Sequence, residues 1–201
     1  MGTPDVSRNA APVSAKPRAS VTLAVTAVFS ALIAVGTMII IPLPKPLAEI
    51  TLAPAIYLAL AVLSDRWTAF NATAIGSFIG ETLNGVLYGY PLIYSFGIVW
   101  ARAPEVLIVA WARRRGTKAL VAAMVGATIF ETLAFFLSDW AFYFYGLFGY
   151  VCNSGAVCSS IWDAYALASL DFLTMLDLIF IPVALVIIRA SRPSFRRLGF
   201  E

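Results

Sequence analysis

Long apolar stretches alternate with short polar segments along almost the whole chain. The first runs over residues 21–43, and the later ones are separated by short segments rich in charged residues, Pro or Gly. A helix needs about 20 apolar residues to cross the hydrocarbon core of a bilayer, so such stretches are typical of membrane-spanning helices. The pattern predicts five further spans, over residues 50–63, 67–88, 91–111, 118–145 and 164–189.

Composition supports this interpretation. Of the 201 residues, 61% are hydrophobic and 12% are charged, whereas a soluble domain has about 25% charged residues. Too little polar surface remains to cover a water-soluble protein, which argues against a soluble enzyme and a secreted disulfide scaffold. We expect an all-α membrane protein, a bundle of six transmembrane helices over residues 21–190. A disordered tail (1–20) and a basic tail (191–201) flank it, both cytoplasmic.

The basic residues predict the orientation of the bundle. With the N-terminus in the cytoplasm and alternating spans, twelve Lys and Arg residues face inward, Lys45 faces outward and Arg102 lies within a span. Cytoplasmic loops of membrane proteins carry such an excess, so we expect a multi-pass plasma-membrane protein with both termini inside, and no nucleic-acid partner. The inward set is Arg8, Lys16, Arg18, Arg66, Arg113, Arg114, Arg115, Lys118, Arg189, Arg192, Arg196 and Arg197.

Ionisable residues within the spans are candidates for function, because each costs about 2.5–3.5 kcal/mol to insert. Six acids stand against one base, an imbalance that favours a cationic or hydrogen-bond-donating ligand. Their depths predict a cluster open to the outside, with aromatic residues at the same level that suit a planar organic ligand. The candidate substrate-binding residues are Glu81, Asn84, Arg102, Glu131, Asp139, Trp140, Tyr143, Trp162 and Asp171; Glu105 and Asp177 are the remaining intramembrane acids.

Several candidates also have a plain structural explanation, whereas Glu131, Asp171 and Asp177 are the hardest to explain in this way because their depth gives them little access to water. Arg102 and Glu105 are three residues apart and could neutralise each other. Glu81 and Asn84 could form interhelical hydrogen bonds only, Asp139 could be solvated near the interface, and the aromatic residues could serve as interfacial anchors.

Cys152 and Cys158 lie in the loop between the fifth and sixth spans, which faces outward in this topology. They form a disulfide there or remain free thiols; their spacing does not decide. Because the chain has no His and only these two Cys, we expect no metal site built on imidazole or thiolate. We expect no cofactor and no enzymatic activity, since no nucleophile–base pair is evident.

The order of several motifs resembles the S components of energy-coupling factor (ECF) vitamin transporters. The first span carries Ala27-Val28-Phe29-Ser30-Ala31, similar to the AxxxA motif of that family. A Pro-rich loop follows at residues 41–46, then Thr51-Leu52-Ala53-Pro54-Ala55-Ile56-Tyr57 and the small-residue segment Gly76-Ser77-Phe78-Ile79-Gly80. The resemblance covers the chain after residue 20.

This resemblance implies a high-affinity binding subunit for a vitamin-like small molecule. Such a subunit docks through Ala27 and Ala31 on a transmembrane coupling subunit, and two ATPase partners hydrolyse ATP, which agrees with the absence of a GxxxxGK[ST] motif here. The acids favour a cation or donor-rich ring, such as thiamine or a pyrimidine or pyridoxine relative. The sequence shows no close match to the binding pattern of a biotin or riboflavin member. Alternatives are a proton-coupled carrier, a non-transporting six-span scaffold or, least favoured, a membrane enzyme.

Overall fold

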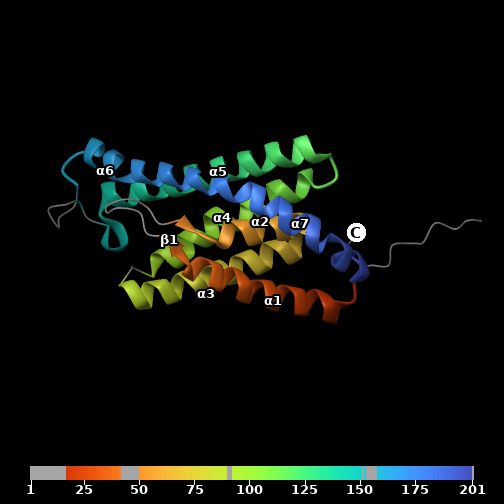
Figure 1. Ribbon diagram of the computed structural model, residues 1–201. Helices are drawn as coiled ribbons and strands as arrows, with labels where there is room; N and C mark the ends of the chain where they lie inside the picture. The colour runs from red at the N-terminus through yellow and green to blue at the C-terminus, as the bar shows by residue number, and fades with distance from the viewer. Residues whose placement is uncertain (1–16, 42–49, 90–91, 151, 153–157, 201) are drawn as a thin grey trace, which may run out of the picture.

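Helices that lie side by side make up the structure (Figure 1). The computed structural model describes residues 17–41, 50–89, 92–150, 152 and 158–200. Most of the predicted N-terminal tail, Lys45 and the core of the Pro-rich loop lie outside these ranges. The elements are α1 (Ala19–Met38), β1 (Ile40–Ile41), β2 (Ile50–Thr51), α2 (Ala53–Leu63), α3 (Arg66–Tyr88), α4 (Ile93–Ala112), α5 (Thr117–Tyr145), η1 (Leu147–Gly149), α6 (Ile161–Ala168), η2 (Ser169–Ile179) and α7 (Phe180–Arg197).

In the described part of the chain, four segments are long and apolar enough to cross a membrane: α1, α4, α5 and the continuous stretch Ile161–Arg197. They agree with the first, fourth, fifth and sixth predicted spans, and they make the protein an all-α membrane protein. Helix α3 has 23 residues and is more polar. Helix α2 has 11 residues, which extend about 16 Å at 1.5 Å per residue.

The first predicted span is too long at its C-terminal end. Helix α1 ends at Met38, and Ile40–Ile41 form a short strand that pairs antiparallel with Ile50–Thr51. Residues before a proline avoid helical dihedrals, and Pro42 follows the strand directly, while β-branched Ile favours extended backbone. The apolar pattern cannot distinguish two strand residues at the end of a span from a further half-turn of helix.

Helix α2 occupies the centre of the bundle. Every one of its residues except Ile56 is buried, and it packs against α1, α3, α4 and α7. A helix that is hydrophobic on all sides is buried within protein, so α2 need not be long enough to face lipid along a full span.

Helices α1 and α3 approach closely because α3 presents glycine where they meet. A Cβ on Gly76 would lie 2.6 Å from the carbonyl oxygen of Ser30, and one on Gly80 would lie 2.7 Å from that of Ala34. Small residues four apart allow this kind of backbone contact in membrane bundles. The small-residue segment noted in the sequence therefore packs α3 on α1.

The predicted basic C-terminal tail is largely helical. Helix α7 continues to Arg197, and the Phe195 ring packs edge-on against Phe29 of α1 at 5.7 Å and against Phe200 at 5.7 Å. Both Phe195 and Phe200 are buried. Arginines dominate the pattern of this segment, but two aromatic residues attach it to the core.

The two ends of the bundle differ in chemistry. The start of α1, the α2–α3 turn, the α4–α5 turn and the end of α7 gather at one end (Figure 1). They carry Arg18, Arg66, Arg113–Arg115, Lys118 and Arg196–Arg197, and we call this the basic end. The ends of α3 and α5 and the start of α6 lie at the other (Figure 1), which also carries Cys152 and Cys158; we call it the disulfide end.

Candidate substrate site

A buried ion pair joins α4 to α5 midway along the bundle. Arg102 Nε donates to Glu131 Oε1 at 2.8 Å, with side chains 6% and 1% exposed. The Tyr57 hydroxyl donates to Glu131 Oε2 at 3.2 Å, and the Arg102 guanidinium lies 5.8 Å from the Tyr57 ring centroid. Both carboxylate oxygens of Glu131 therefore have donors, as a buried charge requires.

Arg102 also contacts α1 and β2. Its Nη2 donates to Thr51 Oγ1 at 3.2 Å, and its Nη1 lies 3.5 Å from Thr37 Oγ1. The guanidinium fork thus connects α1, β2 and α5. The sequence left open an ion pair between Arg102 and Glu105. In the structure Arg102 forms its ion pair with Glu131, 29 residues further along the chain.

Two further acids border this central network. Glu105 is fully buried; Thr128 Oγ1 lies 3.5 Å from its Oε1, and its Oε2 has no hydrogen-bond partner among the described residues. Asp177 of η2 is also buried and interacts electrostatically with Glu131 and Arg102. Three acids therefore surround one base, and the imbalance expected from the sequence persists in the folded chain.

Asn84 and Glu81 form a separate contact toward the disulfide end of α3. Asn84 Nδ2 donates to the backbone oxygen of Thr37 at 3.1 Å and lies 3.5 Å from Glu81 Oε2. The hydrogen bond to Thr37 connects α3 to α1, so Asn84 serves at least the interhelical role that was its plain explanation. Its Oδ1 is buried and has no hydrogen-bond partner in the described part of the chain.

Aspartates and tyrosines meet at the disulfide end in what we call the tyrosine–aspartate cluster: Tyr94, Asp139, Tyr143, Tyr150 and Asp171. The Tyr150 hydroxyl donates to Asp139 Oδ1 at 3.0 Å. The Tyr150 ring centroid lies 4.9 Å from that of Tyr143 and 5.1 Å from that of Tyr94. Asp171 interacts electrostatically with Asp139, and its Oδ2 is buried without a hydrogen-bond partner among the described residues.

The predicted single cluster of acids is therefore divided into parts. Glu131 belongs to the central network with Arg102, Glu81 lies with Asn84 on α3, and Asp139 and Asp171 belong to the tyrosine–aspartate cluster. Depth along a helix gave the level of each carboxylate, but the rotation of each helix in the bundle decides which carboxylates meet.

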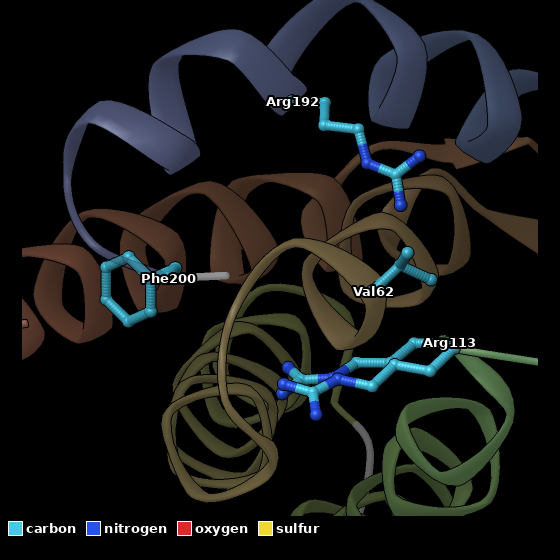
Figure 2. A pocket seen from close by; sticks show the side chains of 5 residues that line it. Val62, Arg113, Arg192 and Phe200 are labelled. Atoms are coloured by element: carbon cyan, nitrogen blue, oxygen red, sulfur yellow. The ribbon is translucent and has the colours of Figure 1, made fainter. Parts of the chain in front are cut away.

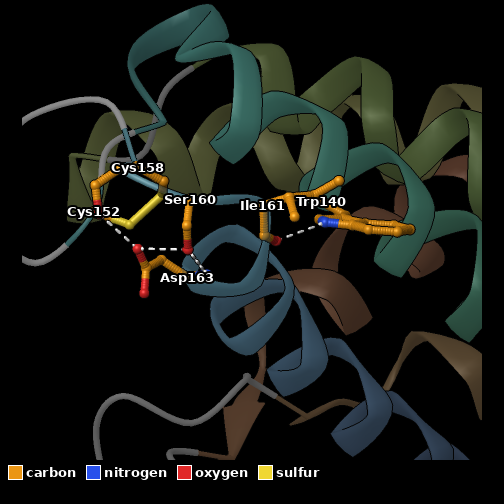
Figure 3. Close-up of a disulfide and its surroundings, with 7 residues drawn as sticks. Trp140, Cys152, Cys158, Ser160, Ile161 and Asp163 are labelled. Atoms are coloured by element: carbon orange, nitrogen blue, oxygen red, sulfur yellow. Dashed lines mark hydrogen bonds between the residues drawn. A yellow bond between two sulfur atoms is a disulfide. The ribbon is translucent and has the colours of Figure 1, made fainter.

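Trp140 and Trp162 lie where α5 meets the start of α6, in different settings. Trp140 Nε1 donates to the backbone oxygen of Ile161 at 3.2 Å, close to the Cys152–Cys158 disulfide and the start of α6 (Figure 3). The Trp140 ring stacks on Phe136 at 5.8 Å. Trp162 is 73% exposed, the exposure expected of an interfacial anchor.

Asp163 is exposed and stabilises the start of α6. Its carboxylate accepts from Ser159 Oγ at 2.7 Å and from Ser160 Oγ at 2.9 Å, and its own N–H donates to Ser160 Oγ at 3.1 Å. This is a capping arrangement, which supplies hydrogen-bond partners to the otherwise unpaired backbone amides at a helix N-terminus. Figure 3 shows it beside the disulfide.

Ala27 and Ala31 lie on an exposed face of α1. Together with Ile75 and Ile79 of α3 they line an apolar groove of about 560 Å³. These two alanines are not part of the close α1–α3 contact, which involves Ser30 and Ala34 of α1 instead.

Sequence reasoning missed the residues that bond to the candidates from elsewhere in the chain: Tyr57, Thr37, Thr51, Tyr94 and Tyr150. A tyrosine within an apolar helix was a usable signal for Tyr57, since a buried hydroxyl needs a partner. The threonines gave no such signal, because Thr in a membrane helix often bonds to its own backbone.

Comparisons with known proteins agree with the resemblance to S components, but the matching model is that of a riboflavin member, whose binding pattern the sequence alone did not indicate. The family model described as "ECF-type riboflavin transporter, S component" matches residues 19–118, which extend from α1 to the first residues of α5. No curated protein and no solved structure matches the chain. Together with the membrane-spanning helices, the family match shows that the chain belongs to the S components, the membrane subunits of ECF transporters.

Proposed function

We propose that this S component binds a vitamin-like ring compound at its disulfide end, in the tyrosine–aspartate cluster, and delivers it to ECF partner subunits. The buried Oδ2 of Asp171 carries the proposal. A buried acceptor without a donor costs about 1–3 kcal/mol, and a donor on a bound ligand would recover that cost. Substrate binding at Asp139, Tyr143 and Asp171 is part of this proposal.

The surroundings of Asp171 favour a planar ligand. The ring of Tyr150 lies 5.1 Å from that of Tyr94 and 4.9 Å from that of Tyr143, centroid to centroid, and the rings of Trp140 and Phe136 stack on each other. Aromatic walls with a few convergent polar groups are typical of small-molecule sites. The carboxylates of Asp139 and Asp171 accept hydrogen bonds, so the ligand must supply donors.

We infer that a flavin-type compound is the preferred ligand. Riboflavin offers a planar, neutral isoalloxazine ring with an imide N–H, and a ribityl chain with hydroxyl donors, and the matching family model names riboflavin. The sequence alone favoured thiamine or a pyrimidine or pyridoxine relative, and the two adjacent carboxylates continue to favour a cation on charge alone.

We further propose six membrane crossings, formed by α1, α2, α3, α4, α5 and the Ile161–Arg197 stretch, with both termini in the cytoplasm. The gathering of basic residues at one end supports this orientation. The disulfide at the other end supports it independently, because disulfides persist in oxidising compartments.

The partners follow from the family: a transmembrane coupling subunit and two ATPases. The exposed alanine face of α1 supports docking there. The groove is apolar, and the side chains of Ala27 and Ala31 are small, so a second helix can approach closely at this point.

Ligand titration of the purified protein tests the proposed function. Riboflavin, thiamine, pyridoxine and folate are added in turn to the detergent-solubilised protein, and binding is followed by thermal stabilisation and by quenching of flavin fluorescence. Saturation about 100-fold above Kd stabilises by about 2.7 kcal/mol. We expect riboflavin to stabilise and Asp171→Asn to weaken its binding at least tenfold, whereas Asp163→Asn, at the exposed cap of α6, leaves it unchanged.

The outcomes distinguish a wrong ligand from a wrong binding site. Stabilisation by thiamine and not riboflavin would replace the flavin-type ligand with a cation at the same carboxylates. Wild-type affinity in both Asp171→Asn and Asp139→Asn would move the site away from the tyrosine–aspartate cluster.

A further inference from the structure

The middle of the Ile161–Arg197 stretch is wound more tightly than an α-helix. Segment η2 (Ser169–Ile179) is a 3₁₀ helix of 11 residues between α6 and α7. A 3₁₀ helix has three residues per turn, and runs of more than about four residues are uncommon because its hydrogen-bond geometry is poorer than that of an α-helix. A run of this length therefore needs support from contacts outside its own backbone.

Polar residues recur along η2 at the period of this winding. Asp171, Thr174 and Asp177 stand three residues apart, with apolar residues between them. Side chains at positions i and i+3 eclipse one another in a 3₁₀ helix, so these three lie in one row. An α-helix turns by about 100° per residue, and it would rotate Asp177 about 120° away from Asp171. The 3₁₀ winding therefore places both carboxylates on the same side of the segment.

This row faces the candidate substrate site. At its centre, Thr174 Oγ1 lies 2.7 Å from Thr132 Oγ1 of α5. On one side of this contact, Asp171 interacts electrostatically with Asp139 of the tyrosine–aspartate cluster. On the other side, Asp177 is buried and interacts electrostatically with the ion pair of the central network. The winding thus directs both carboxylates of the row toward ionisable groups of the site at once.

Two hydroxyl groups support the winding at the centre of the row. Thr174 Oγ1 donates to the backbone oxygen of Asp171 at 2.7 Å. A threonine hydroxyl has a single proton, so Thr132 is the donor in its contact with Thr174. The hydrogen bonds therefore run from Thr132 through Thr174 to Asp171, and they attach the backbone carbonyl of Asp171 to α5.

We propose that Thr132 and Thr174 are positioning residues for the substrate: they hold η2 in its 3₁₀ winding, and this winding presents the Asp171 carboxylate to the ligand. The inference rests on the proposed function, which places the ligand at Asp171. The Oδ2 atom of Asp171 is buried without a hydrogen-bond partner among the described residues. The direction of this side chain, which the backbone winding sets, decides whether a donor on the ligand can reach it.

Riboflavin titration of the detergent-solubilised full chain measures the positioning role. Thr174→Val removes two hydrogen bonds at nearly constant volume, Thr132→Val removes one, and Thr174→Ser keeps the hydroxyl. The affinity falls with the population of the binding-competent winding, and a hydrogen bond of about 1 kcal/mol corresponds to about a fivefold change in that population. We expect Thr132→Val to weaken binding about fivefold, Thr174→Val between about fivefold and about 25-fold, and Thr174→Ser less than about twofold.

The matched control is Thr26→Val on α1. The Thr26 hydroxyl donates to the backbone oxygen of Thr22 within the same helix at 2.9 Å, so the same chemical change is made away from η2. We expect this variant to bind riboflavin as the wild type does. An equal loss of affinity in Thr26→Val and Thr174→Val would show a general effect of removing a hydroxyl, and would overturn the proposal.

A distance measured without ligand tests the winding itself. Ala166→Cys and Val186→Cys place spin labels at two exposed positions that flank η2, and the native cysteines do not react with the label because they form a disulfide. A rise of about 2.0 Å rather than about 1.5 Å per residue makes the 11 residues of η2 about 5 Å longer than an α-helix. We expect pulsed electron paramagnetic resonance to give a distance shorter by up to about 5 Å in Thr174→Val, and an unchanged distance in Thr174→Ser and Thr26→Val.

The two measurements separate this proposal from the proposed function. An unchanged label distance in both Thr132→Val and Thr174→Val would overturn the positioning role, whatever the riboflavin titration gives. A shorter distance with wild-type riboflavin affinity, when Asp171→Asn loses affinity, would also overturn it, because the winding would then not position the carboxylate. Wild-type affinity in both Asp171→Asn and Asp139→Asn would refute the proposed function, and the label distance then decides by itself whether the threonines hold the winding.

Discussion

Replacing Glu131 with glutamine leaves the Arg102 charge buried without its counter-ion. The pair is 2.8 Å apart and both side chains are almost fully buried, so bulk water cannot solvate the remaining guanidinium. Removing one partner of a buried pair costs about 3–5 kcal/mol. For a chain of about 200 residues, 1 kcal/mol shifts Tm by about 2–4 °C, and Glu131→Gln should lower Tm by about 6–20 °C.

A double-mutant cycle separates the pair from its surroundings. The cycle consists of Arg102→Met, Glu131→Leu and the double variant Arg102→Met/Glu131→Leu. The double variant removes both charges at similar volume, and such replacements of buried pairs are often neutral or stabilising. The double variant leaves the hydroxyls of Thr37, Thr51 and Tyr57 without these partners, which retains part of the cost. We therefore expect the double variant to be more stable than either single variant, so that the coupling energy exceeds the cost of one single substitution.

Thermal unfolding of the detergent-solubilised variants provides the assay, followed by intrinsic fluorescence and by size exclusion after heating. Asp163→Asn is the control, because this exposed carboxylate lies far from the network and the loss of its capping contacts should cost only about 1 kcal/mol. Two results would show that the ion pair does not stabilise the bundle. One is a Glu131→Gln variant as stable as the wild type, and the other is a double variant less stable than either single variant.

Three further predictions concern other parts of the chain. Gly76→Ala should destabilise the bundle by about 1–3 kcal/mol, measured as a lower Tm, because its Cβ would lie 2.6 Å from Ser30 O; an unchanged Tm would contradict the close α1–α3 contact. Ala31→Trp should abolish uptake in cells that express the partner subunits while vitamin affinity stays unchanged, because bulk on the exposed face of α1 blocks docking; lost affinity would refute that separation. Burial raises the pKa of Asp65, but hydrogen bonds from Thr68 and Trp67 lower it more, so the net pKa is below its usual value. Asp65→Ala should therefore cost about 1 kcal/mol at neutral pH, and the difference from wild type should disappear as pH falls below about 4, measured by thermal unfolding at several pH values; a constant difference down to pH 3 would exclude the carboxylate as its cause.

The apolar pattern by itself determined the class of protein and the approximate bounds of most helices. Hydrocarbon thickness sets the length of a spanning helix, so residues 91–111 and 118–145 were placed close to α4 and α5 without any knowledge of packing. The gathering of basic residues likewise follows from the sequence, because the turns that carry them must lie at one end once the helices alternate.

The tertiary structure decided which side chains meet. A spacing along one helix gives the level of Arg102, Glu105 and Glu131, but the rotation and neighbours of each helix select the 2.8 Å pair across α4 and α5. The strand pair, the helical course of residues 191–197 and the cavity at the basic end that Arg113 and Arg192 line (Figure 2) depend on contacts between segments far apart in sequence. Such contacts arise from packing and hydrogen bonding that a one-dimensional pattern of hydrophobicity does not encode.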